Sequence, residues 1–302
     1  MYRITRLPDK LDLHMHTVVS DGTDAPEEIA ARVRDAGIAL FSVTDHDATA
    51  GCETVRNLLK EGDPAFIFGV EFSCRDEEGK YHILGYGYDP EAPSIRAVVE
   101  AGHELRLNKL KTRLDLLKSR FGFGFSEEDR AALFALNNPG KPHIGNLMVR
   151  YGYAATKEEA IRKYINECGH KEEHVRPEDA IRGILGAGGI PVLAHPSYGS
   201  GDELIIGEEM DRRLGRLIGF GLRGAEAFYS GFTPAMQEEI LSLAKRYDLY
   251  VTAGSDYHGT NKLVRLGDTG FDARAGYPEG LRRFLSDVSV CTGSAPRQGA
   301  KL

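Results

Sequence analysis

The sequence predicts a parallel α/β fold, most simply one α/β barrel that carries an inserted helical subdomain. The chain has 302 residues, which is long for a single open sheet but normal for a barrel with an insertion. Short apolar runs alternate with helical segments along most of it, as expected where helices join parallel strands. This alternation breaks between about residues 99 and 170.

The apolar runs predict the strands in chain order. They cover residues 10–13, 38–43, 65–70, 81–86, 190–194, 225–228 and 249–253. A polar turn at residues 75–80 precedes the fourth run, so we expect that strand to be antiparallel to the third. The other strands are separated by helical segments, which favours parallel pairing for them.

Helical patterns lie between these strands at residues 26–36, 53–60, 177–185 and 234–247. Asp24 is the expected N-cap of the first helix, and Gly37 is expected to end it.

The interrupting stretch is helical in a different way. Leucines recur at helical spacing in residues 105–117, and further helical patterns cover 126–136 and 157–168. Thr156, with Glu159 three residues later, predicts the start of the last one. We therefore expect a barrel formed by residues 1–98 and 171–302, and a helical insertion or lid at residues 99–170.

Composition and charge limit the classes of partner. Hydrophobic residues make up 41% and charged residues 27% of the chain, as in ordinary globular proteins. The formal net charge is -7, whereas proteins that grip long nucleic acids usually have a basic balance. We therefore expect no long nucleic acid as a partner.

Cysteine spacing and hydropathy predict a cytoplasmic protein. The cysteines Cys52, Cys74, Cys168 and Cys291 are far apart and form no C-x-x-C pair, which favours reduced thiols. No apolar run reaches the ~18 residues of a membrane span. The first residues lack the apolar core of a signal peptide.

Side chains that bind metals follow one predicted strand after another. His14 and His16 end the first strand as His-x-His, and strand alternation points both to the same face. Later strands are followed by His46, Glu71, His195, Asp256 and His258, while His82 opens the fourth strand. Because functional residues gather at the carboxyl ends of barrel strands, we expect one shared site. In contrast, we interpret His103, His170 and His174 as ordinary surface or core histidines.

The mixture of imidazoles and carboxylates limits the kinds of metal that the site can bind. These ligands suit Zn, Mn or Fe, and no cysteine lies among them. A carboxylate can bridge two ions, whereas an imidazole nitrogen binds only one, so Glu71 is the natural bridge. We expect two or three divalent ions.

The motifs around these residues resemble those of the PHP (polymerase and histidinol phosphatase) family of phosphoesterases, in the family's order from residue 12 to residue 259. They are Asp12-Leu13-His14-Met15-His16-Thr17, Ser20-Asp21-Gly22, Thr44-Asp45-His46-Asp47, Gly69-Val70-Glu71, His82-Ile83-Leu84-Gly85-Tyr86, Lys141-Pro142-His143-Ile144, Ala194-His195-Pro196 and Gly254-Ser255-Asp256-Tyr257-His258-Gly259. The resemblance implies a distorted (β/α)7 barrel.

The resemblance also implies a ligand set. The first ion would be held by His14, His16, Glu71 and Asp256, the second by Glu71, His82 and His143, and the third by Asp21, His46 and His258. Spacing alone would make His143 a surface residue of the insertion. His195 is left over, either as the general acid or as a further ligand, and His195, Glu71 and Asp256 are the expected catalytic residues. Hydroxide held by the ions would attack phosphorus, because coordination lowers the pKa of water from 15.7 to about 7.

Substrate contacts are expected from basic side chains. Arg106, Lys109 and Arg113 share one helix face in the insertion and would meet a phosphate, unless that face is only solvated. Arg223 precedes a strand and is a further candidate contact.

The overall resemblance is to cyclic phosphate dihydrolases. The expected substrate is therefore a small phosphorylated metabolite, 5-phosphoribosyl 1,2-cyclic phosphate, which would be opened and then dephosphorylated. The alternatives are a phosphatase of AMP or nucleoside 3′,5′-bisphosphates and a non-catalytic module that binds phosphorylated ligands.

Overall fold

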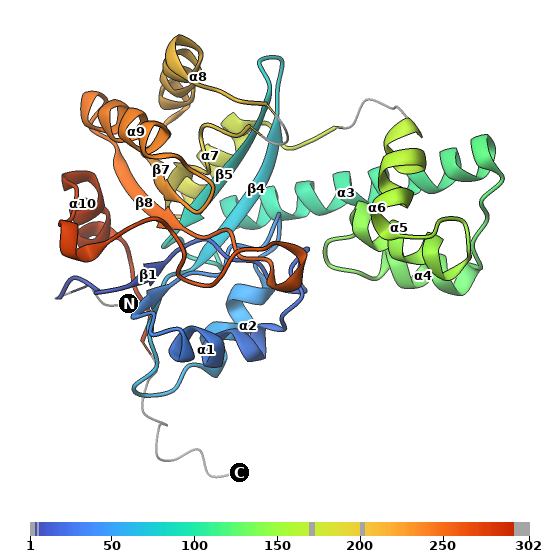
Figure 1. The fold of residues 1–302 in the computed structure, drawn as a ribbon, viewed down its shortest axis with the longest axis horizontal. Helices are drawn as coiled ribbons and strands as arrows, with labels where there is room; N and C mark the ends of the chain where they lie inside the picture. The colour runs from blue at the N-terminus through green and yellow to red at the C-terminus, as the bar shows by residue number, and fades with distance from the viewer. Residues whose placement is uncertain (1–3, 5, 169–172, 200–202, 293–302) are drawn as a thin grey trace.

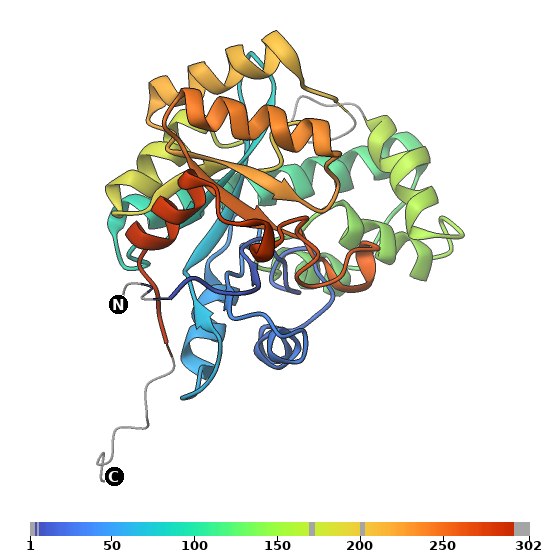
Figure 2. The same cartoon turned by 60° about the vertical axis from the view of Figure 1, so that its left-hand side comes forward.

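The computed structural model describes residues 4, 6–168, 173–199 and 203–292. An α/β body is built around two sheets, and a smaller group of helices lies beside it along the long helix α3 (Figure 1, Figure 2). The predicted α/β class is confirmed. Among the described helices, none combines the length and the hydrophobicity that crossing a membrane requires.

The strands within the described residues divide into a parallel sheet of three and a mixed sheet of five. The first sheet contains β1 (Leu11–Asp12), β2 (Leu40–Phe41) and β3 (Ala65–Phe66). The second contains β4 (Gly69–Arg75), β5 (Lys80–Tyr86), β6 (Ile190–Leu193), β7 (Gly224–Tyr229) and β8 (Tyr250–Gly254). The expected antiparallel pairing of β4 and β5 is confirmed.

The expected distorted (β/α)7 barrel is not confirmed, because the strands of the described residues form two sheets and no closed barrel. The predicted strand at 65–70 is in fact two strands, β3 and β4, which belong to different sheets. Backbone and side-chain hydrogen bonds join the sheets; among the latter, the Ser255 hydroxyl donates to Oδ2 of Asp12 at 2.6 Å. The Leu13 amide donates to the Ala253 carbonyl at 3.0 Å, and a parallel bridge pairs His46 with Glu71.

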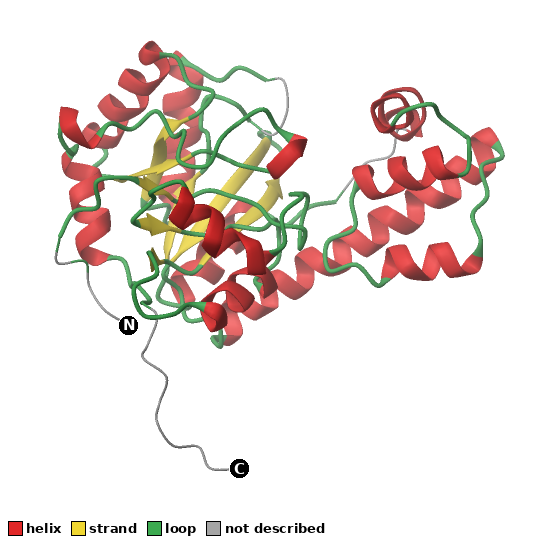
Figure 3. Cartoon of the chain, turned by 60° about the horizontal axis from the view of Figure 1, so that its bottom comes forward, coloured by secondary structure: helices red, strands yellow, loops and turns green. Residues whose placement is uncertain are grey.

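Helices cover the sheets on the outside (Figure 3). In the body they are α1 (Pro26–Asp35), α2 (Ala50–Leu58), α7 (Pro177–Gly186), α8 (Gly207–Phe220), α9 (Pro234–Arg246) and α10 (Glu279–Asp287). The sequence patterns did not predict α8 and α10. Asp24 does not cap α1, because Ala25 is the N-cap and the Asp24 carboxylate accepts the Tyr257 hydroxyl at 2.6 Å. Gly37 follows the helix with φ +68°, as expected of a stop residue.

The insertion helices have their own apolar core. They are α3 (Pro93–Phe121), α4 (Glu127–Phe134), α5 (Lys141–Arg150) and α6 (Lys157–Ala160), followed by a π-helical turn at 161–165 and a 3-10 turn at 166–168. Thr156 caps α6 as predicted, and its hydroxyl accepts the Glu159 amide at 3.1 Å. The predicted boundary at residues 98 and 99 falls inside α3. The start of this helix packs in the main core, while Leu110, Leu114 and Leu117 pack in the second core.

Candidate metal centre

The extended chain after β1 brings two imidazoles to the core of the site. The His16 amide donates to the Tyr257 carbonyl at 2.8 Å, so the chain continues alongside the segment that follows β8. His14 and His16 are both fully buried, and their Nε2 atoms lie 3.5 and 3.2 Å from Oδ1 of Asp256. Alternation along an extended chain therefore aims both rings at one carboxylate, as the His-x-His spacing predicted.

Glu71, in β4, lies at the centre of the imidazoles. Its carboxylate is almost completely buried, with 1% of its side chain exposed. Oε2 lies 3.2–3.3 Å from nitrogen atoms of His14, His16 and His46, and Oε1 lies 2.9–3.3 Å from nitrogen atoms of His82 and His195. This carboxylate is thus placed between both sides of the histidine cluster.

Three sets of side chains have the spacing of metal ligands, with their ligand atoms within 4.8 Å of one another. We call His14, His16 and Asp256 the strand group. We call His46, Glu71 and His82 the bridge group. We call His16, Asp21, His46 and His258 the loop group. Neighbouring groups share His16 or His46, so the three form one continuous cluster.

Several polar atoms of this cluster are buried without any hydrogen bond. They are Nε2 of His14, Nε2 of His16, Oδ1 of Asp21 and both carboxylate oxygens of Glu71. A buried polar atom without a partner costs about 1–3 kcal/mol, more if charged, and native proteins rarely leave several together. Divalent cations would satisfy all of these lone pairs, so the residues present fit a metal centre.

The electrostatics of the cluster also favour a cation. Burial disfavours a charged imidazolium, yet the carboxylates of Asp256 and Glu71 outweigh it and raise the pKa of His16 to about 9. Burial likewise opposes ionisation of Glu71, but the surrounding imidazoles hold the pKa of that carboxyl well below its usual range. The cluster therefore stabilises positive charge at its centre.

Glu226 supports the strand group and was not anticipated from the sequence. It is fully buried in β7, and its Oε1 lies 3.0 Å from Nδ1 of His14, the nitrogen that faces away from Asp256. Its Oε2 accepts the backbone amide of His195 at 2.8 Å. The available signal was a single acid inside the otherwise apolar run at residues 225–228.

Asp256 is held from its other side by two further residues that sequence reasoning did not assign to the metal cluster. Its Oδ2 accepts the Tyr229 hydroxyl at 3.1 Å and the Lys262 ammonium at 2.5 Å. Both partners line a cavity of about 220 Å³ together with His195. Because Oδ2 is occupied in this way, Oδ1 is left to face the imidazoles of the strand group.

His195 lies beside the bridge group, and its geometry bears on the two roles left open. Its Nδ1 lies 2.9 Å from the Tyr198 carbonyl, which can only accept a hydrogen bond, so Nδ1 carries the proton. Nε2 faces the bridge group and lies 3.3 Å from Oε1 of Glu71 and 3.2 Å from Nδ1 of His82. Although burial disfavours a charged ring, the Glu71 carboxylate raises the pKa of His195, so the ligand and the proton-donor role both stay predictions.

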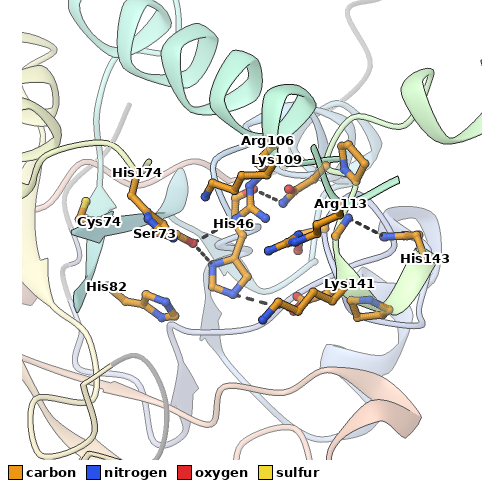
Figure 4. Close-up of a pocket in the computed structure, with 16 residues that line it drawn as sticks. His46, Ser73, Cys74, His82, Arg106, Lys109, Arg113, Lys141, His143 and His174 are labelled. Carbon is orange, nitrogen blue, oxygen red and sulfur yellow. Dashed lines mark hydrogen bonds and ion pairs between the residues drawn. The ribbon is translucent and has the colours of Figure 1, made fainter. Parts of the chain in front are cut away.

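His143 and the predicted basic residues line a second cavity, of about 250 Å³, on the other side of His46 and His82 (Figure 4). His143 lies outside the three groups, and its Nδ1 accepts the Gly140 amide at 3.1 Å. The basic lining residues are Arg106, Lys109, Arg113 and Lys141, with His174 nearby. His174 therefore reaches this cavity, although its polar context suggested an ordinary surface histidine.

Arg106 and Arg223 were also expected to contact substrate. Arg106 donates through Nε to Oδ2 of Asp47 at 2.7 Å, so its guanidinium is already paired inside the protein. Arg223 is exposed and precedes β7, at the amino end of a strand whose other end reaches the site. The structure does not bring Arg223 to either cavity lined by the cluster.

Comparisons with known proteins agree with this geometry. The family described as PHP domain matches residues 12–172. The phosphoribosyl 1,2-cyclic phosphate 1,2-diphosphodiesterase of Eggerthella lenta is 31% identical over 86% of this chain and 97% of that protein. A 5′-3′ exoribonuclease of Haemophilus influenzae is 28% identical over 85% and 93%. The 3′,5′-nucleoside bisphosphate phosphatase of Chromobacterium violaceum is 30% identical over 82% and 87%.

A solved structure shows the same relationship. It belongs to a Bifidobacterium adolescentis protein assigned as a metal-dependent phosphoesterase, with a TM-score of 0.76 and 28% identity over 92% of this chain and 96% of that one. The buried imidazole–carboxylate cluster, the family match and the similarity over nearly the whole chain agree. This chain belongs to the PHP family and is a metal-dependent phosphoesterase.

Proposed function

We propose that this phosphoesterase acts on 5-phosphoribosyl 1,2-cyclic phosphate. It would hydrolyse the cyclic diester to a monoester and then release the phosphate of that monoester, leaving the 5-phosphate in place. The observation that carries the proposal is a metal-ligand cluster that opens onto a small basic cavity of about 250 Å³. A cavity of this size suits a small metabolite rather than a polymer. The similarity to the Eggerthella lenta enzyme, which covers nearly all of that protein, supports this choice.

The three groups would hold the ions, with Mn, Fe or Zn as the metals that such ligands suit. The strand group and Glu71 would bind the first ion, Glu71, His82 and His195 the second, and Asp21, His46 and His258 of the loop group the third. His195 takes the place that the family pattern suggested for His143, because its Nε2 faces Glu71 at 3.3 Å. When bound, such ions supply hydroxide at neutral pH and neutralise phosphoryl charge.

The basic side chains would hold the end of the substrate that does not react. Lys109 and Arg113 of α3 and Lys141 of α5 line the cavity that borders His46 (Figure 4). An ammonium or guanidinium facing a phosphate forms charge-assisted hydrogen bonds, which are about twice as strong as neutral ones. The insertion at residues 99–170 would thereby select substrates with a second phosphate, while the body formed by residues 1–98 and 171–302 performs the chemistry.

A nucleoside 3′,5′-bisphosphate is the second candidate, because one observation favours it. Beside the cavity that contains Lys262, the rings of Tyr198, Tyr229 and Phe232 form a cluster, with centroids 5.0 Å apart for Tyr229 and Phe232 and 5.8 Å for Tyr198 and Phe232. Aromatic side chains of this kind stack on nucleobases. The Chromobacterium violaceum relative is named for such a substrate.

A phosphate-release assay separates the two candidates. The metal-loaded enzyme would be given the cyclic sugar phosphate, a nucleoside 3′,5′-bisphosphate, AMP and histidinol phosphate, and kcat/KM would be compared. The proposal expects the highest value for the cyclic compound, with a transient monoester product before free phosphate. If the enzyme hydrolysed only the bisphosphate, the nucleoside 3′,5′-bisphosphate would be the substrate and the cyclic sugar phosphate would not.

A further inference from the structure

We propose that the helical insertion positions the loop group, so that docking of the insertion and binding of an ion to that group stabilise each other. The inference rests on the proposed role of the loop group as a metal site. Its basis is that three contacts from the insertion, made by separate segments, end on residues that carry or adjoin Asp21, His46 and His258. None of the three insertion residues is itself a proposed ligand.

The strongest contact comes from Arg106 in α3. Its guanidinium forms an ion pair with Asp47 and donates to Oγ of Ser73 at 3.0 Å. Only 18% of the Arg106 side chain and 4% of the Asp47 side chain are exposed, so the pair is largely removed from water. Asp47 in turn accepts the Ser73 amide at 2.9 Å through its other oxygen.

This arrangement holds two residues that adjoin His46, namely Asp47 in the sequence and Ser73 in space. Asp47 directly follows His46 and has φ +50°, a left-handed conformation that is uncommon outside glycine but that aspartate tolerates better than most residues. Oγ of Ser73 lies 3.3 Å from Nδ1 of His46. Arg106 therefore influences both the backbone and the ring of a loop-group histidine.

The second contact ends on the same histidine. Asn138, in the connection between α4 and α5, is buried and donates its side-chain amide to the His46 carbonyl. The backbone of His46 is thus held from the insertion at a point that is distinct from the Arg106 contact.

The third contact reaches Asp21 and His258 through one intermediary. Lys157 in α6 donates to Oδ1 of Asn261 at 3.3 Å. Asn261 donates its side-chain amide to the Asp21 carbonyl at 2.8 Å and its backbone amide to the His258 carbonyl at 3.3 Å. This contact is the most exposed of the three, and we expect it to contribute least.

Reciprocal coupling follows from these contacts. If the docked insertion holds the loop group in a binding geometry, the ion must hold the insertion by the same free energy. Loss of residues that orient ligands typically costs about 10–100-fold in metal affinity. The same loss is not expected for the strand group, whose side chains are oriented by Glu226, Tyr229 and Lys262 of the body.

The test compares Arg106→Met with Arg216→Met in the full-length protein. Arg216 pairs with Asp76 at 2.6 Å, with 27% and 1% of the two side chains exposed, and so matches the Arg106 pair in chemistry and burial at a distance from the cluster. Metal-free proteins would be titrated with Mn²⁺ alone by calorimetry. Asp21→Ala, which removes a ligand of the loop group only, identifies the ion bound there.

The expected result is selective. Arg106→Met lowers the affinity for the ion that Asp21→Ala removes by about 10–100-fold and leaves the affinities for the others within about twofold. Arg216→Met changes none of these affinities. Arg106→Lys, which keeps the charge but not the paired donors, should recover part of the affinity. If Arg106→Met does not fold, Asn138→Ala should show the same selectivity with a smaller effect.

Hydrogen exchange provides a readout that is independent of activity. In the wild type, Mn²⁺ should slow exchange of the amides in α5 (Lys141–Arg150), and in Asp21→Ala it should not. The inference would be overturned if Arg106→Met lowered the affinity for every ion equally. It would also be overturned if Arg106→Met lowered no affinity more than Arg216→Met does. A wild type that binds no Mn²⁺ would instead refute the proposed metal sites themselves.

Discussion

The strand group and the loop group share their chemistry but differ in what surrounds them. The strand group lies inside the body, with 0% of the His14 side chain and 5% of the Asp256 side chain exposed. The loop group is more open, since 13% of the His46 side chain and 37% of the Asp21 side chain are exposed. Body residues orient the first group, and contacts from a separately packed insertion reach the second. One cluster can thus combine a preformed centre with a part that depends on the insertion.

The largest effect is expected from removing a ligand of the strand group. In His14→Ala, phosphate release should fall by at least about 10³-fold, because a metal ion contributes several kcal/mol of transition-state stabilisation. Steady-state assays at saturating Mn²⁺ would measure the loss, and circular dichroism would check that the variant is folded. Near-normal turnover in a folded variant would contradict the assignment of this group.

A smaller but substantial effect is expected from Glu226→Gln. The substitution keeps the size of the side chain but weakens the hydrogen bond to Nδ1 of His14, which lies 3.0 Å from Oε1. Affinity for the ion of the strand group should fall by about 10–100-fold, with the loop group unaffected. Calorimetric titration with Mn²⁺ measures the affinities of both groups. A loss of affinity confined to the loop group would show that Glu226 does not support the strand group.

Lys109→Gln tests the role of the insertion in substrate binding. A charge-assisted hydrogen bond of about 1.5–3 kcal/mol corresponds to a KM increase of roughly 10-fold or more for substrates with two phosphates. The value of kcat should stay within about twofold, since this side chain would bind the ground state and the transition state equally. A fall in kcat with unchanged KM would instead place Lys109 among the residues that act on the reacting phosphate.

The smallest effect is expected at Arg223. This exposed side chain lies at the amino end of β7, away from both cavities, so Arg223→Ala should change kcat/KM by less than about twofold. A larger fall, measured with the same substrates, would show that the site extends beyond the residues described above.

The candidate ligands could be found in the sequence because their spacing is a local property. Histidines beside short strands, and a His-x-His pair in extended chain, can be recognised without knowledge of the fold, while their role as metal ligands stays a prediction. The split of residues 65–70 into β3 and β4 was not predictable in this way, because an uninterrupted apolar run contains no information about which sheet each half joins. The two sheets in place of a closed barrel follow from the same long-range pairing.

Long-range contacts also explain the residues that were missed or misplaced. Arg106 lines the basic cavity and also pairs with Asp47, 59 positions away, and helical spacing cannot reveal such a partner. Glu226 meets His14 across 212 positions, although a lone acid in an apolar strand indicated some buried polar role. Arg223 was expected near the site because it adjoins a strand, but it lies at the amino end of β7, whereas the site lies at the carboxyl end.

Anomalous diffraction from crystals soaked in Mn²⁺ would locate the ions directly. One anomalous peak is expected beside Glu71 and the strand group, a second beside His82 and His195, and a third within the loop group. Peaks that lie away from Glu71, or an absence of peaks at a concentration that supports phosphate release, would contradict the proposed metal sites.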